Sequence, residues 1–199
     1  MNKTKTDRLW SDLQTKFGVP LDDDNLAKVR AIFYPRTLKK NNFFIREGEK
    51  STEIALIMKG AFRSFYIDEL GHDVTKYFYV EGDLILSYLA YISQKESAYS
   101  VQALENSEIF VASIHDWEKI VDGNYQLLSF YKKMVDTVLV MKEEHATSFK
   151  LWNSTERYNN FCVSYPELKQ RIKQCHLASY LGITPVSLSR IRTKQNLNK

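Results

Sequence analysis

The middle of the chain, from about Thr37 to Ile114, alternates short apolar segments with glycine-containing turns. Segments rich in β-branched and aromatic residues, such as Ile54-Ala55-Leu56-Ile57-Met58, are separated by turns such as Lys59-Gly60. Turns that recur roughly every 8–12 residues between such segments are typical of a small antiparallel barrel or jelly roll. The pattern therefore predicts a β-roll as the body of the protein.

Before this region the apolar positions have helical spacing. Leu9, Leu13 and Phe17 are four residues apart, Gly18-Val19-Pro20 interrupts them, and a second stripe runs from Leu26 to Phe33. Residues 7–34 are thus expected to form one or two helices ahead of the roll.

A long helix is expected after the roll, from Asp116 to about Trp152, and Asp122-Gly123-Asn124 can interrupt it. One stripe has the alternating intervals of four and three that are typical of a coiled-coil seam: Leu127, Tyr131, Met134, Val138, Met141 and His145. A second stripe lies to one side of it: Leu128, Val135, Leu139, Ala146 and Phe149. Because such a helix has two apolar faces to cover, we expect it to pack on the roll and on the same helix of a second protomer. A single core helix under the roll is the alternative.

The last periodic pattern predicts two short helices near the C-terminus. Leu177, Ala178 and Leu181 share one helical face, and small Ala178 allows a second helix to cross closely. The pattern stops at Gly182, the residue best able to end a helix in a tight turn.

The second of these helices has its own start signal. Thr184 can cap it, Pro185 suits the first helical position, and Leu188 and Ile191 resume an apolar face. Together the two helices predict a helix-turn-helix, whose second helix enters the major groove of DNA. An ordinary buried pair of antiparallel helices is the alternative.

Charge is distributed unevenly and favours the DNA-binding interpretation. The chain has 28 Lys and Arg against 24 Asp and Glu, a net charge of +4. Seven of the basic residues and none of the acidic ones follow Glu167, which leaves 21 basic and 24 acidic residues in the rest. A basic end on a mildly acidic body fits a domain that docks on phosphates.

Composition excludes several other classes. The 199 residues contain no apolar run near the ~20 needed to span a membrane, and the polar N-terminus leads into no signal segment. Cys162 and Cys175 are too few for a disulfide framework, so we expect a cytoplasmic protein without a cofactor. A cupin-type metal enzyme would need clustered His and Glu ligands, but His72 falls in a predicted turn and His115 lies past the last strand. We therefore expect no enzymatic activity.

Three segments resemble the glycine-punctuated β-roll of the cyclic-AMP receptor protein (Crp/Fnr) family: Ile45-Arg46-Glu47-Gly48-Glu49, Met58-Lys59-Gly60 and Glu81-Gly82-Asp83-Leu84-Ile85. With the helix-turn-helix, the resemblance covers nearly the whole chain. It implies an α+β fold in which residues 1–152 form a jelly-roll-like, cyclic-nucleotide-binding-domain-like sensor with flanking helices. The dimerisation helix would span about 125–152, and residues 153–199 would form the DNA-binding domain. The implied partners are double-stranded DNA, a second copy of the chain, an unknown small-molecule effector and RNA polymerase.

The resemblance also implies which residues contact DNA: Thr184, Pro185, Val186, Ser187, Ser189, Arg190 and Lys194. Arg190 is the strongest candidate for direct readout, since a guanidinium pairs bidentately with guanine O6 and N7. Val186 departs from the acidic residue of many relatives and could instead meet a thymine methyl group.

The implied effector pocket departs further from the family. The segment Leu86-Ser87-Tyr88 lacks the family's glycine and carboxylate, and Glu96-Ser97-Ala98 has an acid where the arginine would stand. Since an acid beside a phosphate is repulsive, we expect no cyclic AMP binding of the usual kind. Six aromatic residues could line a pocket for a less charged ligand or could simply be core: Phe65, Tyr77, Tyr79, Tyr88, Tyr91 and Tyr99.

A different class of function remains open on the sequence. The roll could sense a ligand and act through protein partners, without specific DNA binding. That alternative predicts no salt-sensitive binding to DNA, whereas a transcription regulator requires it.

Overall fold

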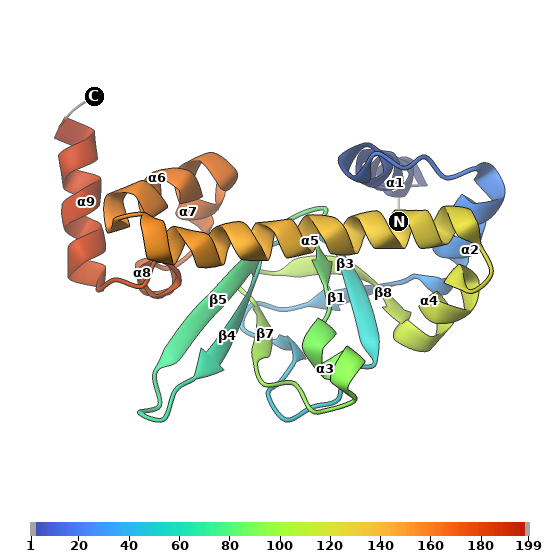
Figure 1. The fold of residues 1–199 in the computed structure, drawn as a ribbon, viewed down its shortest axis with the longest axis horizontal. Helices are drawn as coiled ribbons and strands as arrows, with labels where there is room; N and C mark the ends of the chain where they lie inside the picture. The colour runs from blue at the N-terminus through green and yellow to red at the C-terminus, as the bar shows by residue number, and fades with distance from the viewer. Residues whose placement is uncertain (1–2, 198–199) are drawn as a thin grey trace.

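The computed structural model describes residues 3–197 and the side chains of residues 7–194. Figure 1 shows one long helix, α5, lying across a β-roll, with shorter helices gathered at both of its ends. The strands are β1 (Tyr34–Leu38), β2 (Phe43–Ile45), β3 (Glu53–Lys59), β4 (Phe62–Ile67), β5 (Asp73–Tyr79), β6 (Leu84–Ile85), β7 (Ser100–Ala103) and β8 (Ser107–Ser113). The helices are α1 (Lys3–Phe17), α2 (Asp23–Ile32), α3 (Tyr88–Ser93), α4 (Ile114–Val121), α5 (Tyr125–Leu151), α6 (Ser154–Ser164), α7 (Leu168–Arg171), α8 (Gln174–Tyr180) and α9 (Pro185–Leu197).

The strands form two antiparallel sheets of four, in the orders β1-β8-β3-β6 and β2-β7-β4-β5. Their facing sides enclose an apolar core that includes Ile57, Phe62, Ile85 and Val101. The predicted β-roll is confirmed. The helix α3 is an addition that the sequence pattern does not predict.

The turn between β3 and β4 shows why the roll requires glycine at a turn. Gly60, between β3 and β4, has a φ of 117°, and a Cβ at this position would lie 2.1 Å from the Ser107 Oγ. Any side chain there would collide with the neighbouring strand, so this turn closes only around glycine.

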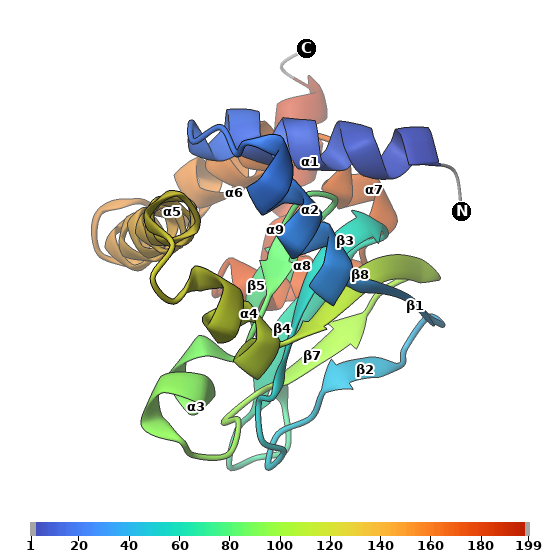
Figure 2. The same cartoon turned by 90° about the vertical axis from the view of Figure 1, so that its right-hand side faces the viewer.

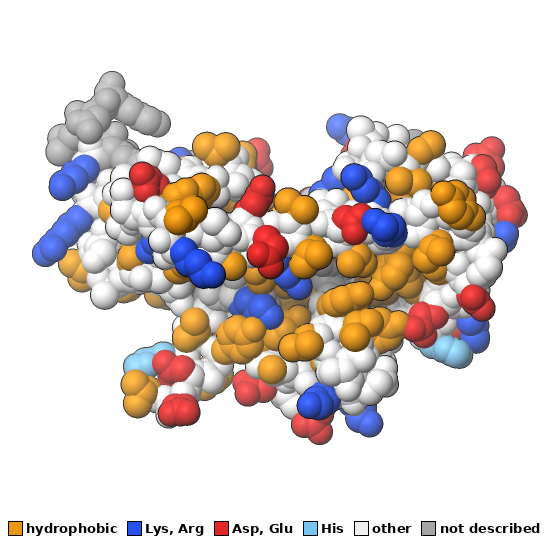
Figure 3. All heavy atoms as spheres, viewed as in Figure 1, with side chains coloured by type: hydrophobic (Ala, Val, Ile, Leu, Met, Phe, Trp, Pro, Cys, Tyr) orange, Lys and Arg blue, Asp and Glu red, His pale blue; other side chains and the backbone are white. Residues whose placement is uncertain are grey.

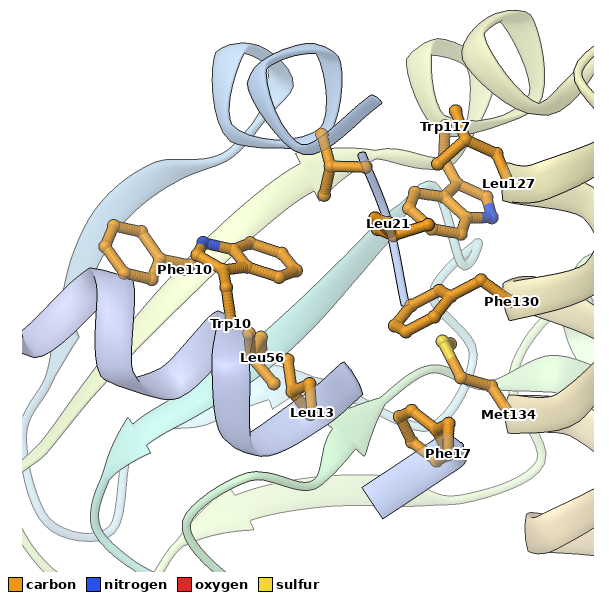
Figure 4. Close-up of a cluster of buried hydrophobic side chains, with 11 residues drawn as sticks. Trp10, Leu13, Phe17, Leu21, Leu56, Phe110, Trp117, Leu127, Phe130 and Met134 are labelled. Carbon is orange, nitrogen blue, oxygen red and sulfur yellow. The ribbon is translucent and has the colours of Figure 1, made fainter. Parts of the chain in front are cut away.

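A second core joins the N-terminal helices to α5 and the roll. Figure 4 shows Leu127, Phe130 and Met134 of α5 pointing toward Phe17 and the other residues of this cluster. Phe17 and Phe130 meet edge to face, with ring centroids 5.5 Å apart. Fully burying side chains of this size contributes about 1.5–3 kcal/mol each.

This core corrects the predicted dimer seam. Leu127 and Met134 are buried within the protomer, and Tyr131 is partly buried against the same cluster. They cannot form an exposed interface, because α1 and the roll already cover them. Of the predicted seam, Val138 and Met141 are exposed, and His145 is half-buried against other rings.

Both ends of α5 follow local signals in the sequence. Asn124 accepts a hydrogen bond from the Leu127 N–H at 3.1 Å, directly after Gly123, where the break was predicted. At the other end Asn153 and Glu156 form a capping box that starts α6. The change of direction at Trp152 and Asn153 separates α5 from the C-terminal helices.

The C-terminal helices pack directly on the roll. One hydrophobic cluster contains Ala61, Phe78 and Leu104 of the roll together with Phe161 and Leu177 of α6 and α8. Figure 2 shows α6 and α7 on the same side of the sheets as α1. Within residues 3–197 no helix is long and apolar enough to cross a lipid bilayer.

Candidate functional site

The turn between α8 and α9 is built from backbone hydrogen bonds. The Ile183 N–H donates to the Ala178 carbonyl and the Gly182 N–H donates to the Ser179 carbonyl, both at 3.0 Å. Gly182 has a φ of 66°. These are the features of a Schellman motif, which ends a helix and turns the chain sharply.

The next helix begins where the sequence predicts. The Thr184 Oγ1 accepts from the Ser187 N–H at 3.1 Å, and Pro185 occupies the first turn, where no N–H is needed. Leu188 is fully buried against α8, and Ile191 is partly buried in the same cluster. The helix α9 is therefore fixed by one apolar face.

The opposite face of α9 is open. Thr184, Pro185, Val186, Ser189, Arg190 and Lys194 are exposed, and Ser187 is half-buried because its hydroxyl lies 3.0 Å from that of Thr184. Neither Arg190 nor Lys194 forms an ion pair with any side chain of residues 7–194. In Figure 1 this helix stands at one extreme of the molecule, away from the roll.

The turn also packs on the end of α5. A Cβ added to Gly182 would lie 2.7 Å from the Phe149 Cε1, so only glycine permits this approach. The Arg157 side chain stacks over Phe149 and donates to the Leu181 carbonyl at 3.1 Å. The position of the helix-turn-helix is thus coupled to the end of the long helix.

A buried charged network joins α8 to the roll. Arg63, only 3% exposed, donates to both carboxylate oxygens of Asp73, at 2.8 and 2.7 Å. The same guanidinium lies 2.8 Å from the His176 Nδ1. Beside it, the Ser179 hydroxyl accepts from the Thr75 N–H at 2.9 Å. These contacts connect the hairpin of β4 and β5 to the first helix of the pair.

His176 is held neutral by this network. A guanidinium can only donate, so the His176 Nδ1 must be the unprotonated acceptor. Burial, followed by the positive charge of Arg63, lowers the pKa of His176 to about 4. The Arg63 hydrogen bonds in turn hold the pKa of Asp73 below its usual value.

Another ion pair removes a cation from the predicted basic surface. Arg171 of α7 donates to Glu81 at 2.7 and 3.0 Å and to Glu105 of the roll. These hydrogen bonds raise the pKa of Arg171. One of the seven C-terminal cations therefore holds the two parts of the molecule together and does not face outward.

The two predicted effector segments do come together. The hydroxyls of Ser87 and Ser97 are 2.8 Å apart and buried, and the Ser97 hydroxyl also donates to the Tyr99 carbonyl at 2.7 Å. Leu86 and Tyr88 are half-buried, whereas Glu96 and Ala98 are exposed. Glu96 thus points its charge to solvent, and the serine hydroxyls are already satisfied.

The six predicted aromatic residues do not share one pocket. Tyr79 is packed between the sheets and donates to the Ser64 hydroxyl, and burial raises its pKa. Phe65 packs with Phe43, and Tyr88 pairs with Tyr91 near α4. Tyr99 is buried in the core between the sheets, whereas the Tyr77 ring lies 5.2 Å from that of His145 on α5. Core packing accounts for most of this set.

Sequence reasoning missed the residues that link the parts of the molecule. Arg63 and His176 are 113 positions apart, so no spacing rule connects them. The signal that was available is a charged residue within the apolar segment Phe62-Arg63-Ser64-Phe65, which requires a buried partner. Within the described part of the chain, no three His, Cys, Asp or Glu side chains form a group that could hold a metal ion.

Comparisons with known proteins agree with this architecture. Residues 35–124 match the cyclic nucleotide-binding domain family. The anaerobic regulatory protein of Aggregatibacter actinomycetemcomitans is 22% identical over 167 residues, which are 78% of this chain and 64% of that protein. This chain therefore spans less than two thirds of that relative's length.

Solved structures share the fold at low identity. FixK2 from Bradyrhizobium japonicum superposes with a TM-score of 0.74 at 16% identity, over 84% of this chain and 86% of that one. A candidate transcriptional regulator of the Crp/Fnr family from Eubacterium rectale gives 0.68 at 14% identity, over 96% and 87%.

The fold and the matching region define a protein that joins a cyclic nucleotide-binding-type β-roll to a C-terminal helix-turn-helix through one long helix. More particularly, residues 35–124 match the cyclic nucleotide-binding domain, and the fold of the chain is similar to that of the Crp/Fnr-family structure from Eubacterium rectale.

Proposed function

We propose that this protein is a homodimeric transcription regulator that binds a two-fold-symmetric DNA site through α9. The observation that carries the proposal is the open face of α9, where Arg190 and Lys194 have no acidic partner among the side chains of residues 7–194. Side chains on the first turns of such a helix reach base edges, and cations farther along reach phosphates. Arg190 would read a guanine, Val186 would meet a thymine methyl group, and Lys194 would contact the backbone.

The second copy would pack on the exposed apolar face of α5. That face is the second stripe of the sequence pattern, in which Leu128, Leu139 and Phe149 are exposed, and the exposed Val138 flanks it. Figure 3 shows hydrophobic side chains gathered along and beneath α5. An apolar surface of this kind on a long helix favours association with the same helix of another protomer.

The roll would act as the sensor, and residues 153–199 as the DNA-binding unit. The contacts of Arg63 with His176 and of Arg171 with Glu81 hold the two units in one arrangement, so a ligand that alters these contacts would alter the placement of α9. We do not assign cyclic AMP as this ligand. The position of the family's arginine is the exposed Glu96, and the hydroxyls of Ser87 and Ser97 already bond to each other.

Salt dependence tests whether α9 contacts phosphates. Lys194→Ala should weaken binding to all DNA sequences and reduce the slope of log affinity against log salt by about one unit, because one fewer counterion is released. Lys133→Ala, an exposed lysine on α5, is the matched control and should leave the slope unchanged. Fluorescence anisotropy with labelled duplex over a salt series measures both. Wild-type protein without salt-sensitive binding would favour a sensor that acts through protein partners.

A further inference from the structure

One arginine side chain joins the end of α5 to the turn of the helix-turn-helix. Arg157 lies in the first part of α6, and its side chain is half-buried. Its Nη1 donates to the Trp152 carbonyl at 2.6 Å, and its Nε donates to the Leu181 carbonyl at 3.1 Å. Its guanidinium carbon lies 4.8 Å from the centroid of the Phe149 ring. The side chain therefore contacts both α5 and α8.

Both hydrogen-bond acceptors are carbonyl groups at the ends of helices. Trp152 is the C-cap of α5, and Leu181 is the C-cap of α8. The last carbonyls of a helix have no donor within the helix, and a cation near them also meets the negative end of the helix dipole. A guanidinium has several donors in a rigid fork, so Arg157 can cap the long helix and the first helix of the pair at once.

These hydrogen bonds restrict direction more than the neighbouring ring contacts do. His145 of α5 stacks on Tyr180 of α8 with ring centroids 4.6 Å apart, and Phe149 lies against Gly182. Apolar burial is non-directional, whereas a hydrogen bond weakens steeply as its angle departs from linear. The two bonds of Arg157 therefore limit the angle between α5 and α8.

This angle also determines where α9 lies. The turn at Gly182 and the buried side chain of Leu188 fix α9 against α8. In Figure 1 the end of α5 meets α6 and α8, and α9 lies beyond them. In a two-fold dimer joined through α5, turning α8 and α9 about the end of α5 would change the separation of the two copies of α9. Because neighbouring base pairs are about 3.4 Å apart, a shift of about 1.7 Å in each copy corresponds to one base pair.

We propose that Arg157 is a positioning residue for DNA binding, which sets the spacing between the two half-sites without contacting a base. This inference rests on the proposed function, because only a symmetric dimer on DNA has a half-site spacing. It divides specificity between two arginines. Arg190 would select bases within a half-site, and Arg157 would select the distance between half-sites.

Duplexes that differ only in the spacer between the half-sites test this role on DNA. One added or removed base pair moves a half-site by about 3.4 Å and turns it by about 35°. Wild-type protein should bind the altered spacers about 10- to 100-fold more weakly than the selected one, because the DNA must deform. Arg157→Gln should narrow this difference by about tenfold, the effect of one charged hydrogen bond, and keep the base preference within each half-site.

Two further variants separate the fork of Arg157 from its charge. Arg157→Lys keeps the charge but cannot bond both carbonyls in the same way, so it should behave like Arg157→Gln. Lys150→Gln removes an exposed charge from the last turn of α5 and should discriminate between spacers as wild type does.

A distance measurement on the free protein tests the same residue without DNA. Spin labels are attached through Lys133→Cys on α5 and Ser189→Cys on α9, both exposed, in protein that also carries Cys162→Ser and Cys175→Ser. Dilution with unlabelled protein keeps the measured distance within one protomer. Pulsed electron paramagnetic resonance should give one narrow distance distribution for the wild-type background and a broader one for Arg157→Gln and Arg157→Lys. Thermal unfolding of each variant checks that the broader distribution belongs to folded protein.

Equal widths in the wild-type background and in both Arg157 variants would overturn the positioning role. Weakening by the same factor at every spacer length would also overturn it, since lost stability or a lost phosphate contact has that effect. Wild-type protein that binds no inverted repeat would contradict the proposed function instead, and the spin-label distances would still decide whether Arg157 orients α9.

Discussion

At the scale of single residues, the most consequential side chains are those that hold the roll against the helix-turn-helix. Arg63 and His176 come from distant parts of the chain and meet in a buried place with Asp73. A charge buried with its partners contributes little net stability, but removing one partner is costly. A substitution at Gly182 should also be costly, because an added Cβ would lie 2.7 Å from the Phe149 ring.

The lowered pKa of His176 makes this contact sensitive to acid. A histidine has a pKa near 6.5 when unfolded, and here it falls to about 4 when folded, so the unfolded state binds more protons between these values. The stability from His176 is therefore complete above about pH 6.5 and is lost as the pH falls toward 4. The full loss is on the order of 3 kcal/mol.

Urea unfolding at pH 7 and pH 5 measures this effect. His176→Gln keeps an acceptor for Arg63 but cannot titrate, so it should lose less stability on acidification than wild type. His115→Gln, at an exposed position, should behave as wild type. His145, whose pKa is also lowered by burial, contributes equally to all three proteins. Equal losses in wild type and His176→Gln would rule out the role given to His176.

At the scale of elements, local signals predicted most of the fold. They did not predict which partner covers each apolar face of α5. The turn at Gly182, the cap at Thr184 and the break at Gly123 each depend on neighbouring residues, and each lies where the sequence indicates. A heptad pattern, in contrast, says that a stripe is buried but not against what. Leu127 and Met134 belong to the protomer's own core, so the second stripe is left exposed.

Substitutions at two adjacent residues of α5 distinguish the proposed dimer face from the rest of the helix surface. Leu139 and Val140 are each 56% exposed, but they point about 100° apart on the helix. Leu139→Glu should place a carboxylate on each side of the two-fold axis and raise the dimer dissociation constant by about tenfold or more. Val140→Glu should leave the dimer intact. Sedimentation at micromolar concentration measures both, and a monomeric wild type would contradict the assembly.

Two features of the candidate site were beyond prediction from the sequence. The β-bulge at Lys76, next to Thr75 on β5, depends on the register of β4 with β5, which no local pattern specifies. The meeting of Arg63 with His176 depends on how α8 packs on the roll. The exposed face of α9 was more predictable, because a helix end and an apolar stripe together define which side chains face outward.

At the scale of the whole molecule, α5 connects three functions. Its first half completes the N-terminal core, its exposed apolar face is the proposed dimer interface, and its last turn supports Gly182 through Phe149. In Figure 1 it runs from the helices around α4 to the helix-turn-helix. A change in the roll that displaces α5 would therefore reach both the assembly and the position of α9.

Selection of bound sequences from a random DNA pool tests the central claim most directly. Wild-type protein should enrich an inverted repeat whose half-sites are about one helical turn, ~34 Å, apart, because a symmetric dimer presents two copies of α9. Arg190→Ala should lose preference at one base pair per half-site and bind the selected site roughly 5- to 150-fold more weakly, whereas Arg8→Ala, at an exposed position of α1, should select as wild type does. An enriched sequence without two-fold symmetry, or selectivity that survives Arg190→Ala, would contradict the account.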